Sequence, residues 1–590
     1  MPCIVADIFF CNFAGCSALA SIECSSWDTS SVTDMAGMFF CCLLLSAADV
    51  SSWDVSRVTS CDCMFAGCRV LKPTGSFWFH LGDDCVNGNL ALIPARVAIR
   101  LTDEVGFTLH NQISRRNFVA GAATVGAMAA FGMAGCSSKG SGKAESKAEE
   151  YDIVIVGAGG AGMSAAIAAH DAGVEKVVVL EKEGNVGGNT NFSSSGMNAS
   201  ETKFQKAQGI EDSNELFAQE TLDGGHDTGN PELVHFMCDN SAGAIDWLDG
   251  LGITLDNITM TGGMSVKRCH RPTDGSAVGK TIVPGLQKAV EDRGIEIKTN
   301  CDVKELVQAD DGSITGVKTD KGDYSAKAVI LAAGGLGSNP DMITKYRPDL
   351  EGYVSTNQPG ATGDGYAMAE AVGAQLIQMD QIQIHPTVEQ SSSMLIAEGL
   401  RGGGAILVNS EGKRFFNEMS TRDKVSAAEL EQPGKFAWEV FDQTVYDKNK
   451  AAANYDKSGL VKKGDSVEAL AKEIEVDAAT LQATIDAYNK LTTEGATDEF
   501  GRTQGMIEFQ PGNMYAIKVA PGIHHEMGGI KINVDNQALG EGDEPIKGLY
   551  AAGEVTGGIH GNNRIGGNAV CDITVFGKNA GEVVAKAIQG

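Results

Sequence analysis

Two glycine-rich segments, far apart in the sequence, constrain the fold of this chain more than any other feature. The first contains Gly157, Gly159 and Gly162 in a G-x-G-x-x-G pattern that follows the apolar residues 151–156. The second spans residues 552–569, close to the carboxyl end. Glycine allows backbone to approach a bound ligand closely. The two segments can serve one large ligand only if the fold brings them together.

The first segment predicts a buried parallel strand, a tight turn and a helix whose N-terminus holds a pyrophosphate. Gly157 permits the turn, Gly159 permits close approach of the phosphates, and Gly162 lets the helix pack on the strand. Glu181 follows the apolar residues 177–180, nineteen residues after Gly162. A carboxylate at this place accepts hydrogen bonds from ribose hydroxyls. We therefore expect dinucleotide binding, and the alternative is a purely structural turn.

Further glycine-rich segments favour FAD over NAD as the cofactor. They occur at residues 187–190, 193–196 and 331–335, and each can bring backbone near a large cofactor. Glu554 follows the predicted strand 548–552, a position suited to the ribityl or pyrophosphate part of the cofactor. The cofactor contacts predicted beyond the first motif are Asn189, Thr190, Gly196, Gly335, Asp364, His525, Glu554, Asn568 and Ala569.

The charge of the chain excludes several classes of partner. Its 590 residues include 47 basic and 76 acidic ones, which gives a net charge of −29. Such a surface repels nucleic acid and anionic lipid, and an anionic substrate needs a locally basic site. No C-x-x-C pattern occurs among the 15 cysteines, so the spacings for covalent haem and zinc ribbons are absent. We expect no haem and no metal ion.

Residues 1–85 repeat internally. Trp27 and Trp53 lie in similar segments 26 residues apart, and Phe39 and Phe65 have the same spacing. A fixed period of this size is typical of solenoids. The pattern W-D-x-S-x-V-T resembles a leucine-rich-repeat-like family of bacterial surface proteins. We expect these degraded copies to take no part in the chemistry. A surface adhesion protein built on them is the alternative from another functional class.

Residues 110–136 resemble an export signal. Arg115 and Arg116 precede a short Ala- and Gly-rich apolar run that leads to Cys136. A twin-arginine signal with a lipoprotein-type cleavage box has this form, and the alternative is a buried Ala-rich helix. The signal predicts a working protein that begins shortly before the twin arginines, with residues 137–150 as a solvated linker. It also predicts peripheral membrane attachment through a lipidated Cys136. The expected location is the outer face of the cytoplasmic membrane, the periplasm or the cell envelope.

Residues 151–590 alternate predicted helices with short β-branched runs, which indicates an α/β fold. Helical patterns cover 161–172, 285–293 and 478–491, and strand patterns cover 176–180 and 328–332.

With the motifs above, this region resembles the flavoprotein subunit family of fumarate reductases and succinate dehydrogenases. It is most similar to the soluble, exported flavocytochrome-type fumarate reductases and to urocanate reductases. The resemblance implies a two-dinucleotide-binding, Rossmann-like FAD domain formed by residues 151–380 and 511–590. It implies an inserted α+β capping domain of residues 381–510. It also implies non-covalent FAD, whose reduced form passes a hydride from N5 to the C=C bond of an unsaturated carboxylic acid.

The resemblance also implies roles for individual residues. His385, His524 and Arg564 match residues that bind the substrate carboxylates, and Arg422 matches the proton donor. Glu398 and Arg401 match the relay that feeds this donor, and their i, i+3 spacing suits one face of a helical turn. Cationic donors near the carboxylate stabilise the carbanion character that develops between hydride and proton transfer. Without the family context, His385 reads as a strand-end histidine and Arg422 as a surface ion-pair partner.

One position departs from the family pattern. Ala397 stands where fumarate reductases of this family commonly have a threonine that contacts a substrate carboxylate. The missing hydroxyl puts fumarate itself in doubt and leaves urocanate-like and cinnamate-like acids open. An alternative enzyme class is a FAD-dependent dehydrogenase such as a 3-ketosteroid Δ1-dehydrogenase, whose site uses tyrosines. The expected electron donor is a separate cytochrome, quinol oxidase-type or flavin protein.

Overall fold

A computed structural model describes residues 21–22, 47–48, 148–495 and 498–590. The centre of the larger part is a six-stranded sheet with the order β22-β23-β13-β4-β5-β9. Its strands β23 to β9 are parallel, and β22 is antiparallel to β23. The bounds are Gln537–Leu539 for β22, Pro545–Ala551 for β23, Ala328–Leu331 for β13, Ile153–Val156 for β4, Val177–Leu180 for β5 and Glu296–Lys298 for β9. Strand β13 lies between β4 and β23, so the strands that lead into the two glycine-rich segments belong to one sheet.

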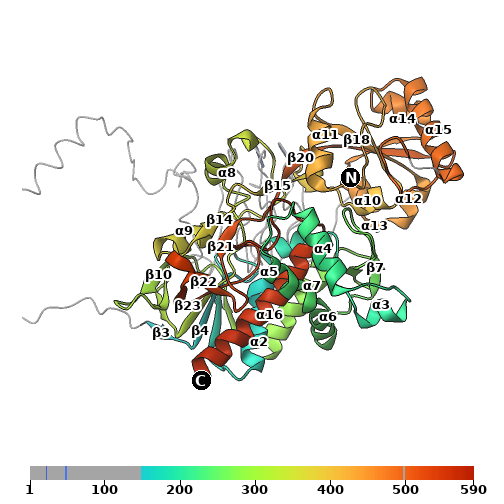
Figure 1. Ribbon diagram of the computed structural model, residues 1–590. Coiled ribbons are helices and arrows are strands. Elements are labelled where there is room, and N and C mark those ends of the chain that lie inside the picture. The colour runs from blue at the N-terminus through green and yellow to red at the C-terminus, as the bar shows by residue number, and fades with distance from the viewer. Residues whose placement is uncertain (1–20, 23–46, 49–147, 496–497) are drawn as a thin grey trace, which may run out of the picture. The chain divides into compact units, whose positions relative to one another are not determined.

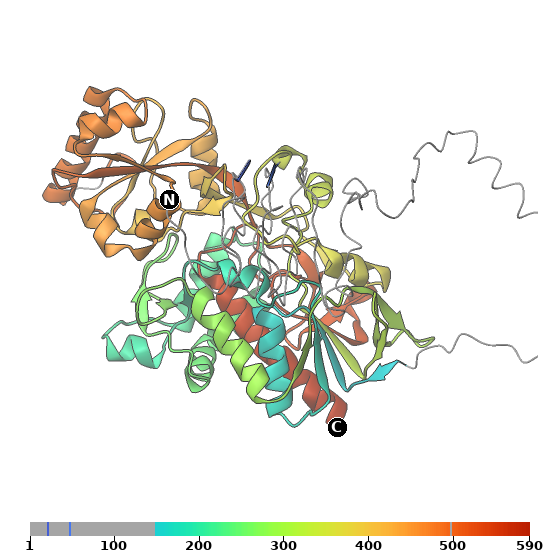
Figure 2. The same cartoon turned by 180° about the vertical axis from the view of Figure 1, so that it is seen from behind.

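Helices pack tightly against this sheet. Helix α2 (Gly160–Asp171) packs against α16 (Asn568–Gln589) and α7 (Gly279–Asp292), as Figure 2 shows. A side chain at Gly577 or Gly581 of α16 would lie 2.7 or 2.2 Å from a carbonyl oxygen of α2. These two glycines allow the two helices to touch through their backbones. The close contact fixes the N-termini of α2 and α16 relative to each other.

Smaller elements complete this region. A four-stranded sheet contains β10 (Val303–Gln308), β11 (Ile314–Thr319), β12 (Asp323–Ser325) and β3 (Glu149–Glu150). Two three-stranded sheets contain β6 (Met197–Asn198), β8 (Cys269–Arg271) and β7 (Asn257–Thr259), and β14 (Leu376–Ile377), β21 (Gly529–Lys531) and β24 (Thr556–Gly557). The further helices include α3 (Lys203–Ala207), α4 (Asn214–Gly224), α5 (Pro231–Asp239), α6 (Ser241–Gly250), α8 (Pro340–Tyr346) and α9 (Asp364–Ala371).

A second sheet forms the centre of the cap, drawn in orange in Figure 1. Its order is β16-β15-β20-β18-β17, and β19 also pairs with β20. The bounds are Met394–Leu395 for β16, Ile382–Glu389 for β15, Met514–Glu526 for β20, Ala437–Asp442 for β18, Ile406–Val408 for β17 and Val461–Gly464 for β19. The cap helices are α10 (Gly399–Gly402), α11 (Arg422–Leu430), α12 (Gln443–Lys448), α13 (Lys450–Lys457), α14 (Val467–Glu473) and α15 (Ala478–Glu494).

Alternate residues of the cap strands belong to two separate apolar layers. Leu407 and Ile517 belong to one layer, which also contains Val425 of α11. Ile406 and Ala516 belong to the other. Strand β20 lies within the segment predicted for the FAD domain, yet its first half pairs with β18 of the cap. Its second half pairs with β15, which carries the predicted substrate histidine. The domain boundaries themselves stay predictions.

The predicted α/β fold with a FAD-binding core is confirmed. The predicted helix 161–172 is α2, and the strand pattern 176–180 is β5. The predicted helix 285–293 begins earlier, at Gly279, although Pro284 lies inside it. In the described part of the chain, no helix combines the length and the apolar character that a membrane crossing requires.

Four described residues lie in the separate N-terminal unit. Strands β1 (Ser21–Ile22) and β2 (Ala47–Ala48) pair in parallel, with Ser21 opposite Ala47. The paired residues are 26 positions apart, which equals the period of the sequence repeat. Parallel pairing at one period is what stacked repeats produce. The repeat architecture of residues 1–85 stays a prediction. The signal at 110–136 lies outside the described residues.

Candidate functional site

The turn after β4 has the geometry that the first motif predicts. Gly157 has φ +104°, and a Cβ there would lie 2.4 Å from the carbonyl oxygen of Ala332, just after β13. A Cβ at Gly162 would lie 2.0 Å from the carbonyl oxygen of Gly157, so the helix contacts the turn directly. The amide of Gly160 donates to Thr190 Oγ1 at 3.1 Å. Glycine is therefore required here for both backbone conformation and space.

Two carboxylates lie along the same groove. Glu181 follows β5, and its Oε2 accepts the amide hydrogen of Ala158 at 2.9 Å. Burial raises the pKa of Glu181. Asp364 begins α9 and forms an ion pair with Lys182, and both residues line the groove. Glu181 is therefore held by the glycine-rich turn itself, in the position predicted for a ribose contact.

Two hollows in the surface share one wall. The first contains Gly157, Gly159, Glu181 and Asp364, together with other residues of the turn. The second contains Arg422, Arg564 and His524, whereas His385 is fully buried and is not among its lining residues. Residues that line both are Asn189, Thr190, Glu554 and Ile573. The hollows therefore form one elongated cleft that joins the two glycine-rich segments.

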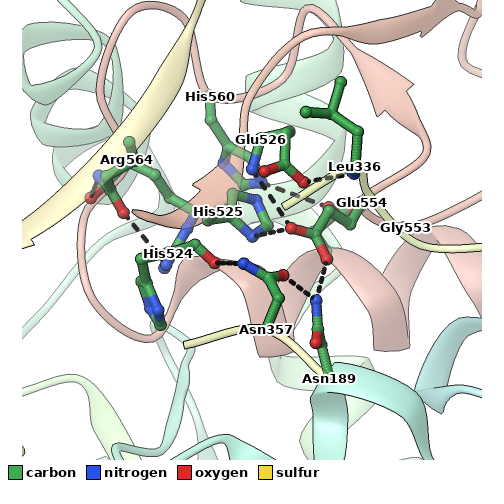
Figure 3. A network of polar contacts seen from close by, with 12 residues as sticks. Asn189, Leu336, Asn357, His524, His525, Glu526, Gly553, Glu554, His560 and Arg564 are labelled. Carbon is green, nitrogen blue, oxygen red and sulfur yellow. Dashed lines mark hydrogen bonds and ion pairs between the residues drawn. The ribbon is translucent and has the colours of Figure 1, made fainter. Parts of the chain in front are cut away.

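A buried polar network lies at the middle of this cleft (Figure 3). Glu554 Oε1 lies 3.1 Å from Nδ1 of His525, and Glu554 Oε2 accepts a hydrogen bond from Asn189 at 3.0 Å. The amide of Glu526 donates to Glu554 Oε1 at 3.2 Å. The nearby His525 lowers the pKa of Glu554 to about 2 although burial opposes this, whereas burial raises the pKa of Glu526. Glu554 thus joins β20, β23 and the turn at Asn189 through one charged carboxylate.

Two arginines of the second hollow donate to one atom. Gln383 Oε1 accepts from Arg422 Nη1 at 2.9 Å and from Arg564 Nη2 at 3.3 Å. Gln383 Nε2 in turn donates to Asn563 Oδ1 at 2.8 Å. Burial and the charge of Arg422 lower the pKa of Arg564 to about 9. Two cations held this close create a strongly positive site.

Glu398 is the anion nearest to these arginines. Its Oε1 accepts from Arg422 Nε at 2.6 Å and lies 3.7 Å from His385 Nε2 and 3.9 Å from Arg401 Nη2. The positive charge of Arg422 and Arg401 holds the pKa of Glu398 well below its usual range despite burial. A Cβ at Gly566 would lie 2.5 Å from Glu398 Oε2, so glycine lets this loop approach the carboxylate. The predicted relay residues are thus in contact, and Arg422 pairs with Glu398 rather than with Asp423.

The two predicted substrate histidines face each other. The rings of His385 and His524 meet edge to face with centroids 5.3 Å apart. Thr356 Oγ1 lies 2.8 Å from His524 Nδ1. Burial and the charge of Arg422 lower the pKa of His385 to about 3, and the same causes lower the pKa of His524. Both rings are therefore neutral near pH 7, and the positive charge of the site belongs to the arginines.

Other predicted cofactor residues support the cleft, and two of them also line it. Asn568 binds Asn198 and Thr221 at the start of α16. A Cβ at Gly196 would lie 2.3 Å from a backbone oxygen, and one at Gly335 would lie 1.7 Å from Glu526 Oε2. Ala569 and Gly196 lie in the wall of the second hollow. These small residues keep the surrounding segments close to the cleft.

Sequence reasoning missed Gln383 as a site residue. It lies two positions before His385 on β15, and side chains two positions apart point to the same face of a strand. That spacing is the signal by which it could have been found. Asn357 was also missed: its amide donates to the backbone oxygen of His524 at 3.1 Å, and no motif marks it.

The cleft has the shape and chemistry that FAD requires. It is long, it passes the N-terminus of α2, and its walls contain glycines at positions where any side chain would collide. Several buried polar atoms along it, among them His525 Nε2 and Arg564 Nε, have no hydrogen-bond partner among the described residues. Such atoms are normally satisfied in a complete site. The residues present therefore fit a bound dinucleotide.

Comparison with known proteins gives the same result. Residues 152–570 match a family model described as FAD binding domain. The chain is 49% identical over 448 residues to an NADH:fumarate oxidoreductase of Klebsiella pneumoniae (strain 342), a match that covers 75% of this chain and 48% of that protein. It is 38% identical over 451 residues to a urocanate reductase of Eggerthella lenta, covering 73% of this chain and 74% of that one. The open conformation of a flavocytochrome c3 fumarate reductase is similar in structure, with a TM-score of 0.64 and 43% identity over 75% of this chain and 79% of that one.

The fold and the cleft define a flavoprotein, an FAD-dependent oxidoreductase. The chain belongs to the FAD binding domain family, and its relatives include proteins named NADH:fumarate oxidoreductase and urocanate reductase. It spans about half the length of the Klebsiella relative. Residues 10–80 match a second family, described as a Mycoplasma protein of unknown function.

Proposed function

We propose that this protein reduces the C=C bond of a small unsaturated carboxylic acid. The observation that carries the proposal is the convergence of Arg422 and Arg564 on one acceptor, in a hollow continuous with the FAD cleft. Guanidinium groups bind planar carboxylates through paired hydrogen bonds. The names of the relatives, which include fumarate and urocanate reductases, support the same chemistry.

Particular residues would hold the cofactor. Gly157, Gly159 and the N-terminus of α2 suit the pyrophosphate, and Glu181 suits a ribose. His525 and Glu554 lie farther along, next to the arginine hollow. Reduced FAD, when bound, supplies the hydride. The site carries no covalent link in this proposal, and electrons come from a separate donor protein such as a cytochrome or a flavin protein.

The arginines and histidines bind and orient the acid. Arg564 and His524 hold one carboxylate, and His385 lies across from His524 to contact the other end of the substrate. A bound carboxylate offsets the repulsion between Arg422 and Arg564, so the site prefers an anion. The neutral histidines can donate one hydrogen bond each without adding charge.

Arg422 delivers the proton in this proposal. It gives a proton to the carbon next to the one that receives the hydride. A proton from Arg401 then passes through the ionised Glu398, whose Oε1 lies 2.6 Å from Arg422 Nε, and restores the charge of Arg422. Guanidinium groups do not lose protons readily, so the short contact with Glu398 is essential. Arg401 lies on the far side of Glu398 and is held by the backbone oxygen of Glu418 at 2.8 Å. Proton return along these three residues keeps Arg422 charged between turnovers.

The substrate class includes fumarate-like, urocanate-like and cinnamate-like acids. Ala397 offers no hydroxyl for a second carboxylate, and its amide donates to the hydroxyl of Tyr455 at 2.9 Å. A 3-ketosteroid dehydrogenase would use tyrosines, and none is among the described residues that line the arginine hollow. We also propose export through the signal at 110–136, with a lipidated Cys136 attaching the enzyme to the outer face of the membrane.

Anaerobic flavin reoxidation tests the function directly. The holoenzyme is reduced with dithionite, the excess is removed, and fumarate, urocanate, acrylate or cinnamate is added. We expect at least one acid to restore the oxidised flavin spectrum within seconds and to yield its saturated product. Succinate serves as the control that cannot accept the hydride. If none of the four acids reoxidises the flavin, the proposed reaction is wrong.

A further inference from the structure

Helix α11 has a polar buried face. Arg422, Ser426 and Glu429 are all buried, and their spacing of four and three residues puts them on one side of the helix. Apolar residues normally occupy such a face. Arg422 lies at the substrate hollow, whereas the exposed residues 433–435 follow the other end of the helix. The helix therefore connects the proposed site with solvent through a line of polar side chains.

A second carboxyl group, Glu439, belongs to the same region. It lies on β18, where its strand neighbours across the sheet are Leu407 and Ile517. Both neighbours belong to the apolar layer that also contains Val425 of α11. Glu439 is fully buried there. Burying a carboxyl group among apolar side chains costs free energy unless the group is paired or neutral.

Several of the buried polar groups of α11, β18 and Arg401 lack, in the part of the chain that the structure describes, hydrogen-bond partners that would account for their burial. Among the described residues, neither carboxyl oxygen of Glu439 has a hydrogen-bond partner, and the same holds for Ser426 Oγ. Within this same part of the chain, the carboxyl oxygens of Glu429 have no partner of good hydrogen-bond geometry, although the backbone of Ala437 lies near enough to lower its pKa. Arg401 Nε and Nη2 also have none, although its Nη1 is held by Glu418. Several unsatisfied buried groups in one place mark a candidate functional site rather than a packing element.

Burial favours the protonated form of both carboxyl groups. Burial raises the pKa of Glu439 to about 8, against the lowering effect of Arg401 and Arg502. Burial raises the pKa of Glu429 well above its usual range, and Arg401 again opposes this. Glu418 also raises the pKa of Glu439, and Glu439 in turn raises the pKa of Glu429 and of Tyr455. Both acids therefore hold a proton that they can give up.

We propose that Glu429 and Glu439 form a proton-holding pair that supplies Arg401 and, through Glu398, the proton donor Arg422. This inference rests on the proposed function. Each turnover places one proton on the substrate carbon; Arg422 gives it, and Glu398 and Arg401 restore it. The pair then loses one proton to Arg401 and regains one from solvent at the far end of α11. No electrons move in these steps. Glu429 and Glu439 act through other residues and are positioning residues.

Isosteric neutral variants separate this role from a structural one. Glu429→Gln, Glu439→Gln and the double variant keep the side-chain volume and remove the exchangeable acid. A purely structural role predicts unchanged turnover, because the glutamine amide resembles the neutral carboxyl group that burial favours at both positions. Glu429→Asp retains an acid and provides the rescue. Tyr488→Phe is the matched control, since it removes a buried, unpartnered hydroxyl in the other apolar layer of the cap.

The measurement is steady-state turnover from pH 6 to 9 with the faster of fumarate and urocanate. For the double variant we expect at least a tenfold lower kcat, KM within twofold of the parent, and loss of the decline in rate through about pH 8. Glu429→Asp should recover part of the rate, and Tyr488→Phe should match the parent. If the double variant has the rates and the pH profile of the parent, the proposed proton-holding pair is wrong and the proposed function still stands. If the double variant loses FAD, the same comparison of kcat, KM and pH profile is made with the two single variants. If the parent reduces neither acid, acrylate and cinnamate are used in the same way, and a parent that reduces none of the four overturns both this inference and the proposed function.

Discussion

Arg422 and Arg564 are 142 positions apart in the sequence and donate to the same atom, Gln383 Oε1. One comes from the start of the cap helix α11 and the other from the loop before α16. Their mutual repulsion costs free energy, and Gln383 offsets only part of it, because a neutral amide oxygen is a weaker partner than a carboxylate. A bound carboxylate would complete the arrangement. The site is therefore built for an anion even though the chain has a net charge of −29.

Replacing Arg422 tests the proton donor. Arg422→Ala should lower kcat by about 10³-fold, because it removes both the acid and one ligand of the carboxylate. FAD should stay bound, since the contacts of Arg422 are with Glu398 and Gln383. Turnover and the flavin absorbance of the purified variant give the two readings. Activity within tenfold of the parent would show that another group delivers the proton.

Anion affinity should fall at high pH. The pKa of Arg564 is lowered to about 9, so this group is charged below pH 9 and becomes neutral above it. We expect the Kd of succinate, measured from the flavin spectrum, to be flat to about pH 8 and to rise about tenfold per pH unit beyond 9. In Arg422→Gln the like charge is gone, so the rise should begin at higher pH. A Kd that is independent of pH up to 10 would contradict this assignment.

Much of the cofactor cleft could be predicted from the sequence because its demands are local. Gly157 and Gly162 are needed by a strand, a turn and a helix that follow one another directly, and the structure has this order. The resemblance brought Arg422 and Glu398 to one site, and they lie in contact. These residues lie in short sequence motifs, and the motifs identified them.

Other parts of the site depend on tertiary contacts that no sequence motif reveals. Glu439 lies in the strand Ala437–Asp442, where an acidic residue between apolar ones predicts a solvent-facing position. In the structure its strand neighbours Leu407 and Ile517 belong to an apolar layer with Val425 of α11, and the carboxyl group is buried. Gln383 acquires its role only when the loop before α16 brings Arg564 to it. Long-range burial and shared acceptors follow from tertiary packing.

The glycine turn should be intolerant of a methyl group. Gly157→Ala would place a Cβ 2.4 Å from the carbonyl oxygen of Ala332 at φ +104°. We expect loss of FAD and a lower Tm, because strain and collision both act at this turn. Gly173→Ala is the matched control, since φ is +94° but the nearest atom is a side-chain nitrogen at 3.4 Å. FAD retention in Gly157→Ala equal to that in Gly173→Ala would show that the close approach is unimportant.

Glu439, the buried acid of β18, should make the stability of the protein depend on pH. The pKa of Glu439 is raised to about 8 in the folded protein, whereas a glutamate in the unfolded chain has a pKa of about 4.3. The stability that this difference contributes is fully present below about pH 4.3 and is lost as the pH rises through about 8. Glu439→Gln is neutral throughout, so its Tm relative to the parent should increase from pH 5 to pH 8, by about 5 °C. Thermal unfolding of the holoenzyme measures this difference. Glu431→Gln, at an exposed position, should show no trend, and a flat difference for Glu439→Gln would mean that Glu439 is ionised in the folded protein.

Substrate choice should respond to residue 397. Ala397→Thr adds a side-chain hydroxyl, and one polar contact contributes about 1 kcal/mol. We expect kcat/KM for fumarate relative to acrylate to rise about fivefold, because only fumarate has a second carboxylate to contact. Ala397→Val is the control, since valine has nearly the shape of threonine without the hydroxyl. An equal change in both variants would assign the effect to volume, and no change in either would remove residue 397 from the determinants of specificity.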